Sequence, residues 1–217
     1  MSDSDSFIDE VTEEVRRDRL FGYVRRYGWL AVLLVLLLVG GAAWNEWRKA
    51  GERQRAQAFG DAILAALERP DRDARAAALA EIAAPGPGGA AVLGLLTAAE
   101  EGAANPAEAA RRLLALADSP GEVPQVYRQL ATLKAVTIPD SGLDAADRRM
   151  RLEGLIPAGG LVRLLAEEQL ALLEIETGDR DAALDRLQGI VEDAEATAGL
   201  RQRAAQVIVA LGGEPAA

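Results

Sequence analysis

The sequence predicts an all-α protein in which a single N-terminal transmembrane helix is followed by a solenoid of helical hairpins. Two observations support this prediction. The nineteen residues of Tyr27–Asn45 contain no charged side chain. The chain after Ala50 is rich in alanine, leucine, arginine and glutamate, is punctuated by glycine and proline, and has no stretch with the alternating pattern of a β-strand.

The uncharged run is long enough to cross a bilayer once. At about 1.5 Å of rise per residue, a helix of this length spans about 28 Å, close to the roughly 30 Å hydrocarbon core. Tryptophans stand at both edges of the run, where their rings would settle at the membrane interfaces. We therefore predict a transmembrane helix over residues 27–47. Its predicted membrane-anchoring residues are Trp29, Leu33, Leu36, Trp44 and Trp47.

Two other structures could account for the same run. A buried helix of a soluble domain rarely extends this far without a polar face. A cleavable signal peptide could use the small residues of Gly40–Ala43 as its cleavage site. However, the 26 residues before the run include seven acidic ones, and the run has tryptophan at both ends. Both features favour a retained helix.

Residues 1–26 predict a short amphipathic tail. Phe7, Val11 and Val15 are spaced four residues apart, so they share one face of a helix. This tail either continues into the transmembrane helix, rests on the membrane surface or docks a cytoplasmic partner.

The charges beside the run indicate its orientation. The Arg25–Arg26 pair adjoins the apolar run with no acid nearby, whereas Glu46 and Glu52 dilute the positive charge on the other side. Positive charge favours the cytoplasmic side. We therefore expect a cytoplasmic N-terminus and an exported domain over residues 48–217.

Composition excludes several functions. The chain has neither cysteine nor histidine, which removes thiol nucleophiles, Cys/His zinc sites, Ser-His triads and imidazole bases. Its net charge is -10, and acidic domains repel phosphate backbones. The sequence therefore predicts no enzyme activity, no catalytic, cofactor-binding or metal-binding residues, no small-molecule substrate and no nucleic-acid partner.

A repeat is visible after the apolar run. The tetrapeptide DRDA occurs at Asp71–Ala74 and at Asp179–Ala182, a spacing of 108 residues, or three times 36. A period of roughly 34 to 38 residues with two helices per unit is typical of tetratricopeptide-type solenoids. An all-α domain with accidental periodicity is the alternative. The second helix of each hairpin is expected to start near Asp71, Asn105, Leu143 and Asp179.

The clearest unit is Leu161–Ala194. Gly178 is predicted to end its first helix, and Asp179 to cap the start of its second. The second helix is expected to bury Ala183, Leu184, Leu187, Ile190, Val191 and Ala194. A last helix, ending at Gly212-Gly213, repeats the pattern and is expected to cap the array.

Glycine and proline divide the chain into these helices. The predicted breaks are Pro70, Pro85–Gly89, Gly102–Pro106, Ser119–Pro124, Pro139–Gly142, Pro157–Gly160, Gly178 and Gly199. The PGPGG segment of Pro85–Gly89 resembles no phosphate-binding motif and is interpreted as a hinge between helices.

Four glutamates could suggest acid-base chemistry. However, the side chains of neighbouring helical positions diverge by about 100°, so we expect these glutamates to form a solvated face. They are Glu167, Glu168, Glu174 and Glu176.

This layout resembles the ancillary SecYEG translocon subunit family, membrane-anchored proteins with a tetratricopeptide-like exported domain. The resemblance covers nearly the whole chain. The segments that carry it are FIDEVTEEVRRDRL and RRYGWL before the run, the tryptophans after it, and GDRDAALDRLQGIV and AGLRQRAAQVIVALGG near the C-terminus. It implies a bacterial inner-membrane protein whose periplasmic domain binds the Sec translocon and periplasmic chaperones.

The leading functional hypothesis is thus a non-enzymatic scaffold that binds proteins through its solenoid. The alternative is a membrane-tethered regulator that holds a cytoplasmic signalling protein through its N-terminal helix. In a solenoid the first helices of neighbouring hairpins line a concave face. We therefore expect partners to bind in a groove between the Gln125–Ile138 and Leu161–Glu176 helices. Arg128 and Arg163 are the candidate contact residues.

Overall fold

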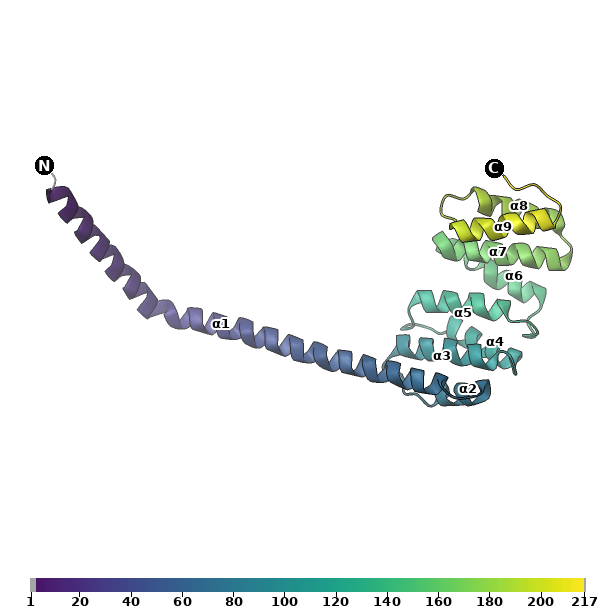
Figure 1. The fold of residues 1–217 in the computed structure, drawn as a ribbon, viewed down its shortest axis with the longest axis horizontal. Coiled ribbons are helices and arrows are strands. Elements are labelled where there is room, and N and C mark those ends of the chain that lie inside the picture. Colours follow the sequence, from purple (N-terminus) through teal and green to yellow (C-terminus); the bar gives the residue numbers. More distant parts are fainter. Residues whose placement is uncertain (1–2, 217) are drawn as a thin grey trace. The chain divides into compact units, whose positions relative to one another are not determined.

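The protein is helical throughout the part that its computed structural model describes. That part comprises residues 3–216, with side chains at 29, 30 and 33–216. Within it lie nine α-helices, one short 3-10 helix and no strand (Figure 1). The all-α prediction is confirmed. The elements are α1 (Asp3–Leu67), α2 (Arg72–Ala80), α3 (Pro87–Glu101), α4 (Pro106–Ala117), α5 (Gln125–Thr137), α6 (Ala145–Glu153), η1 (Ile156–Ala158), α7 (Gly160–Thr177), α8 (Arg180–Glu192) and α9 (Ala198–Ala210).

The chain divides into two compact units. The first is Met1–Gln57 and the second Ala58–Ala217, so the last turns of α1 belong to the second unit. The second unit starts later than the boundary at residue 48 that the sequence predicts. The physical reason is that α1 continues without a break, and nearly all residues between 48 and 57 are exposed.

The apolar run lies on α1 with its described side chains exposed. From Leu33 to Val39 each residue exposes between 47% and 68% of its surface. Within the described residues, no helix has a stretch both long and apolar enough to span a membrane. Tyr27, Gly28, Ala31 and Val32 of the predicted span have side chains outside the described set, as does the predicted amphipathic tail over residues 1–26.

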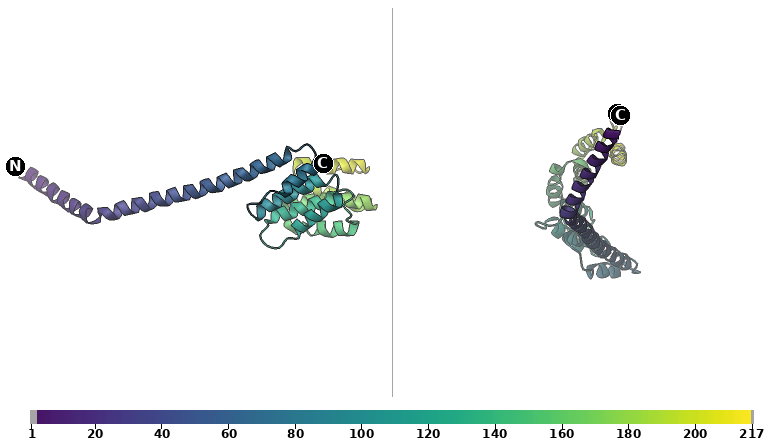
Figure 2. Two further views of the ribbon diagram at one scale, coloured as in Figure 1. Left: turned by 90° about the horizontal axis from the view of Figure 1, so that it is seen from below. Right: turned by 90° about the vertical axis from the view of Figure 1, so that its left-hand side faces the viewer.

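The second unit is an array of helical hairpins, as predicted. Its helices stack from α2 at one end to α8 and α9 at the other (Figures 1 and 2), and neighbours along the chain pack together. The second helices of the hairpins are α2, α4, α6 and α8. They begin at Arg72, Pro106, Ala145 and Arg180, within two residues of the predicted starts.

The apolar core is divided along the array. Four clusters of buried side chains follow one another, each shared by helices adjacent in sequence, rather than merging into one centre. This is the packing expected when each unit contacts only its neighbours. The central members of the clusters are Leu79 and Leu93, then Leu95 and Leu113, then Leu152 and Leu170, and finally Leu164, Leu187 and Ile208.

Local capping marks several helix ends. The side chains of Asp71, Asp144 and Asp179 each accept a hydrogen bond from a backbone N–H in the first turn of the helix that follows. Gly178 ends α7 with φ of 87°, a left-handed conformation that glycine adopts without steric cost. The predicted roles of Gly178 and Asp179 are confirmed.

Three predicted boundaries are wrong. Gly199 lies inside α9, whose N-cap is Thr197, because the Thr197 hydroxyl accepts from the N–H of Leu200 and starts the helix earlier. Ala194 is exposed because α8 ends at Glu192. The PGPGG segment is not wholly a hinge, since Pro87 is the first residue of α3, a position where its missing N–H costs nothing.

Candidate partner-binding surface

Helix α5 forms one wall of an open pocket. Gln125, Arg128, Gln129 and Thr132 recur at helical spacing and share one face, which lines this pocket. The other wall comes from Ala117 at the end of α4 and from the segment between α6 and α7, namely Gly154, Leu155, Pro157 and Ala158. The volume is about 310 Å³. We call this site the α5 pocket.

Arg128 is the one charged residue lining the α5 pocket, and its guanidinium is poorly satisfied. Its Nη1 donates to the backbone oxygen of Ser119 at 3.5 Å, which is a long contact. Its Nε is buried and has no hydrogen-bond partner among the described residues. Within the described residues Arg128 therefore has one long hydrogen bond and a buried Nε without a partner.

Arg163 has a different environment. Its Nη2 donates to Asp193 at 2.7 Å and to Glu195 at 3.3 Å. The hydrogen bond from Arg163 lowers the pKa of the Asp193 carboxyl, and the pKa of Arg163 is raised by its bonds to Asp193 and then Glu195. Arg163 lines a second pocket, of about 460 Å³, between α7 and α8.

The structure therefore does not bring the two candidate arginines into one groove. Arg128 faces the segment between α6 and α7, whereas Arg163 faces α8. Both side chains are half-buried rather than fully exposed, and the carboxylates of Asp193 and Glu195 already occupy the guanidinium of Arg163. The role of either residue in partner binding stays a prediction.

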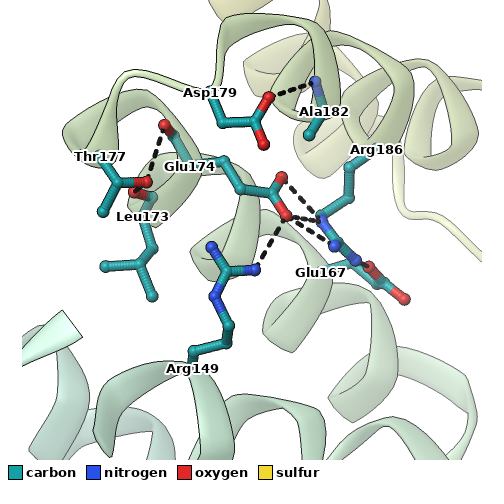
Figure 3. A network of polar contacts seen from close by, with 8 residues as sticks. All are labelled: Arg149, Glu167, Leu173, Glu174, Thr177, Asp179, Ala182 and Arg186. Atoms are coloured by element: carbon teal, nitrogen blue, oxygen red, sulfur yellow. Dashed lines mark hydrogen bonds and ion pairs between the residues drawn. The ribbon is translucent and has the colours of Figure 1, made fainter. Parts of the chain in front are cut away.

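A network of ion pairs joins α6, α7 and α8 (Figure 3). The Glu174 side chain, only 3% exposed, accepts from Arg186 at 2.7 Å and from Arg149 at 3.4 Å. Arg186 also pairs with Glu167. Hydrogen bonding from Arg186, opposed by desolvation, lowers the pKa of Glu174, and the bond to Glu174 raises the pKa of Arg186. Glu174 and Arg186 are therefore both ionised at neutral pH.

The expectation that these glutamates form a solvated face is wrong for two of them. Glu168 and Glu174 are buried, and Glu168 accepts two hydrogen bonds from Arg203 of α9 at 2.8 and 2.9 Å. Glu176 is exposed and pairs with Arg148, while Glu167 is half-buried. Because the partners lie 12 to 35 residues away in sequence, helical phase alone could not identify them.

These carboxylates have structural partners that limit their chemistry. Each buried one is held by at least one arginine, and an ionised, paired carboxylate is a poor general acid. In the part of the chain with described side chains, no group of three or more acidic residues could hold a metal ion. The network instead ties successive helices of the array together.

The predicted membrane-anchoring residues all lie on the exposed surface of α1. Leu33 and Leu36 are 47% and 64% exposed, and Trp29, Trp44 and Trp47 are between 63% and 72% exposed. The rings of Trp44 and Trp47 meet edge to face with centroids 5.5 Å apart. Two neighbouring aromatic rings thus mark one end of the apolar run.

Comparison of the chain with protein-family models, with curated proteins and with solved structures found no match.

Proposed function

We propose that the protein is a non-enzymatic scaffold of the bacterial inner membrane. Residues 27–47 anchor it with the N-terminus in the cytoplasm, and its tetratricopeptide-like solenoid in the periplasm binds protein partners at the Sec translocon and periplasmic chaperones. The choice of partners rests on the resemblance of the segments around the apolar run and near the C-terminus to ancillary translocon subunits.

The exposed apolar surface of α1 is the observation that carries the anchor. Seven consecutive residues, Leu33–Val39, are leucine or valine and expose about half or more of their surface. Such a surface is unfavourable in water, at roughly 25 cal/mol for each Å² of apolar area. A bilayer accommodates a helix that is apolar on all sides, and the tryptophans near both ends suit its interfaces.

The hairpin array supports the scaffold role. Repeated hairpins build extended surfaces with open pockets between helices, and proteins of this architecture commonly use such surfaces to bind other proteins. The pockets of the array include the α5 pocket and the one between α7 and α8. Histidine, the most frequent general base, and cysteine, a strong nucleophile, do not occur in the chain.

A single charge tests the anchor. Leu36→Arg places a cation near the middle of the predicted span and should cost about 3 kcal/mol of insertion free energy. Part of the protein should then leave the membrane fraction on alkaline extraction. The control is Leu64→Arg, which makes the same change at an exposed leucine of α1 outside the span. Extraction of the unmodified protein would contradict the anchor.

Crosslinking tests the scaffold. Photo-reactive residues in place of Arg128 and Arg163 should capture translocon subunits or periplasmic chaperones in intact membranes, and should capture more of them than a photo-reactive residue in place of Arg203 on the last helix. Equal capture from all three positions would contradict binding in the groove. A chain lacking residues 1–20 should retain these partners, because binding is assigned to the array. Loss of every partner on this deletion would instead favour a regulator that acts through its cytoplasmic tail.

A further inference from the structure

Arg128 differs from the other arginines of the array. Seven further partly buried arginines each pair with a carboxylate within 4 Å; these are Arg75, Arg112, Arg148, Arg149, Arg151, Arg163 and Arg186. Arg201 donates a hydrogen bond to the backbone oxygen of Asp193. After the hydrogen bond from Arg163, the positive charge of Arg201 also helps to lower the pKa of the Asp193 carboxyl. Among the described side chains no carboxylate lies within that distance of Arg128, so Arg128 has no ion-pair partner there.

The geometry of the α5 pocket leaves room for an external carboxylate. Its lining includes no acidic residue, and the nearest acid in sequence to Ala117, Asp118, is already engaged by Arg151 through two bonds of 3.1 Å. An arginine guanidinium presents a planar set of donors that matches a carboxylate. Gln125 and Gln129, one turn apart on the same wall, add amide donors beside it.

The opposite wall is apolar. Leu155, Pro157 and Ala158 face the polar residues of α5 across a volume of about 310 Å³. This is the lower end of the range of roughly 300 to 1,000 Å³ for ligand pockets, enough for a few side chains but not for a folded element. An extended peptide alternates its side chains between two sides, so it can present acids to one wall and apolar groups to the other.

We propose that the α5 pocket binds an extended segment of a partner protein in which glutamate or aspartate alternates with apolar residues. A partner carboxylate pairs with Arg128, and the neighbouring apolar side chains rest on Leu155 and Pro157. This assignment deepens the proposed scaffold function and rests on it. It also separates the two candidate arginines: Arg128 binds the partner, while Arg163 holds α7 to the segment after α8.

Binding of a synthetic peptide tests the proposal. The probe is a fluorescently labelled peptide of alternating glutamate and leucine, and its counterpart has glutamine in place of glutamate. With the full-length chain in mild detergent, fluorescence anisotropy should show at least about tenfold tighter binding of the glutamate peptide, as expected for a charge-assisted bidentate pair. Arg128→Gln should abolish the difference between the peptides.

Lys134→Gln is the matched control. It removes one positive charge from the same helix, but Lys134 lines a different pocket, near Arg72 and Ile138. This variant should keep the preference for glutamate. Equal loss in both variants would show attraction to general positive charge and would overturn the proposal, as would equal binding of the two peptides by the unmodified chain.

A second variant guards against loss of structure in Arg128→Gln. Gln129→Trp keeps Arg128 but fills the α5 pocket with a large side chain, and it should weaken binding of the glutamate peptide at least about tenfold. If Gln129→Trp retains full binding, the peptide does not bind in the α5 pocket and the proposal is wrong.

Crosslinking separates this proposal from the scaffold function. Photo-reactive residues at Gln125 and at Arg203 report on the α5 pocket and on α9. If partners are captured from Arg203 but not from Gln125, the proposal that the α5 pocket binds them is wrong, while the scaffold function stands. If neither position captures a protein, both the α5-pocket proposal and the scaffold function are wrong.

Discussion

Leucines of α1 and leucines of the hairpin array have opposite environments. Leu36, Leu37 and Leu38 are 64% to 68% exposed, whereas Leu79, Leu173 and Leu187 are fully buried. All six lie in α-helices, so helix propensity does not distinguish them. The difference arises from the spacing of apolar residues, which fill every side of α1 between Leu33 and Val39 but only part of the circumference of α8.

This contrast shows how the apolar surface of each region can be shielded from water. In the array a stripe of leucine, isoleucine and alanine fits against the next helix, and burial is complete within the chain. In the Leu33–Val39 stretch of α1 the apolar side chains are exposed, so an external apolar phase would have to cover them. The two regions should therefore respond differently to the same substitution.

The largest expected effect comes from shortening one leucine in each region. Leu187→Ala removes a fully buried side chain and should cost about 2 to 5 kcal/mol of unfolding free energy. Leu36→Ala should change the unfolding free energy of the array by less than about 0.5 kcal/mol. In detergent, thermal unfolding followed by circular dichroism should show a melting temperature lower by roughly 5 to 15 °C for Leu187→Ala only. Equal shifts would contradict the contrast.

A smaller effect should come from the ion-pair network. Arg186→Ala leaves Glu174, whose side chain is 3% exposed, with only the longer contact to Arg149, and should cost about 3 kcal/mol of unfolding free energy. Arg111→Ala is the control, because the Arg111 side chain is 74% exposed in its pair with Glu108 and should contribute less than about 1 kcal/mol. Urea unfolding of both variants measures the difference. Similar midpoints would mean that burial adds nothing to the pair.

The smallest effect concerns acid. Because Arg186 and Arg149 lower the pKa of Glu174 in the folded protein, the stability gained from this carboxylate is present above its usual pKa of about 4.3. It should be lost as the pH falls through the lower folded-state pKa. Urea unfolding at neutral pH and near pH 3 should therefore show a larger acid loss for the unmodified protein than for Glu174→Gln. Identical pH dependence would contradict the assignment.

Local signals in the sequence predicted most of the fold. Asp71 and Asp179 accept hydrogen bonds from the first turn of the next helix, and Gly178 takes the left-handed conformation, so each boundary depends on a few neighbouring residues. The boundary at Gly199 was mispredicted because the capping hydroxyl of Thr197 acts before the glycine. Glycine is tolerated inside α9 at a modest cost in stability.

The candidate site was predicted less completely. The sequence identified Arg128 and Arg163 as surface arginines but gave no sign that one is paired and the other is not. Asp193 and Glu195 lie about 30 residues from Arg163 and approach it only because α7 and α8 fold back on each other. The buried position of Glu174 was missed for the same reason.

The sequence by itself determined where most of the helices begin, how they recur and which stretch is apolar on every side. These properties follow from backbone propensity, capping and side-chain spacing, all of which act within one or two turns. Tertiary structure alone decided which glutamates are buried and which arginines are paired. Those outcomes depend on distances between helices, and only packing of the hairpins brings residues such as Glu168 and Arg203, 35 positions apart, within 2.8 Å.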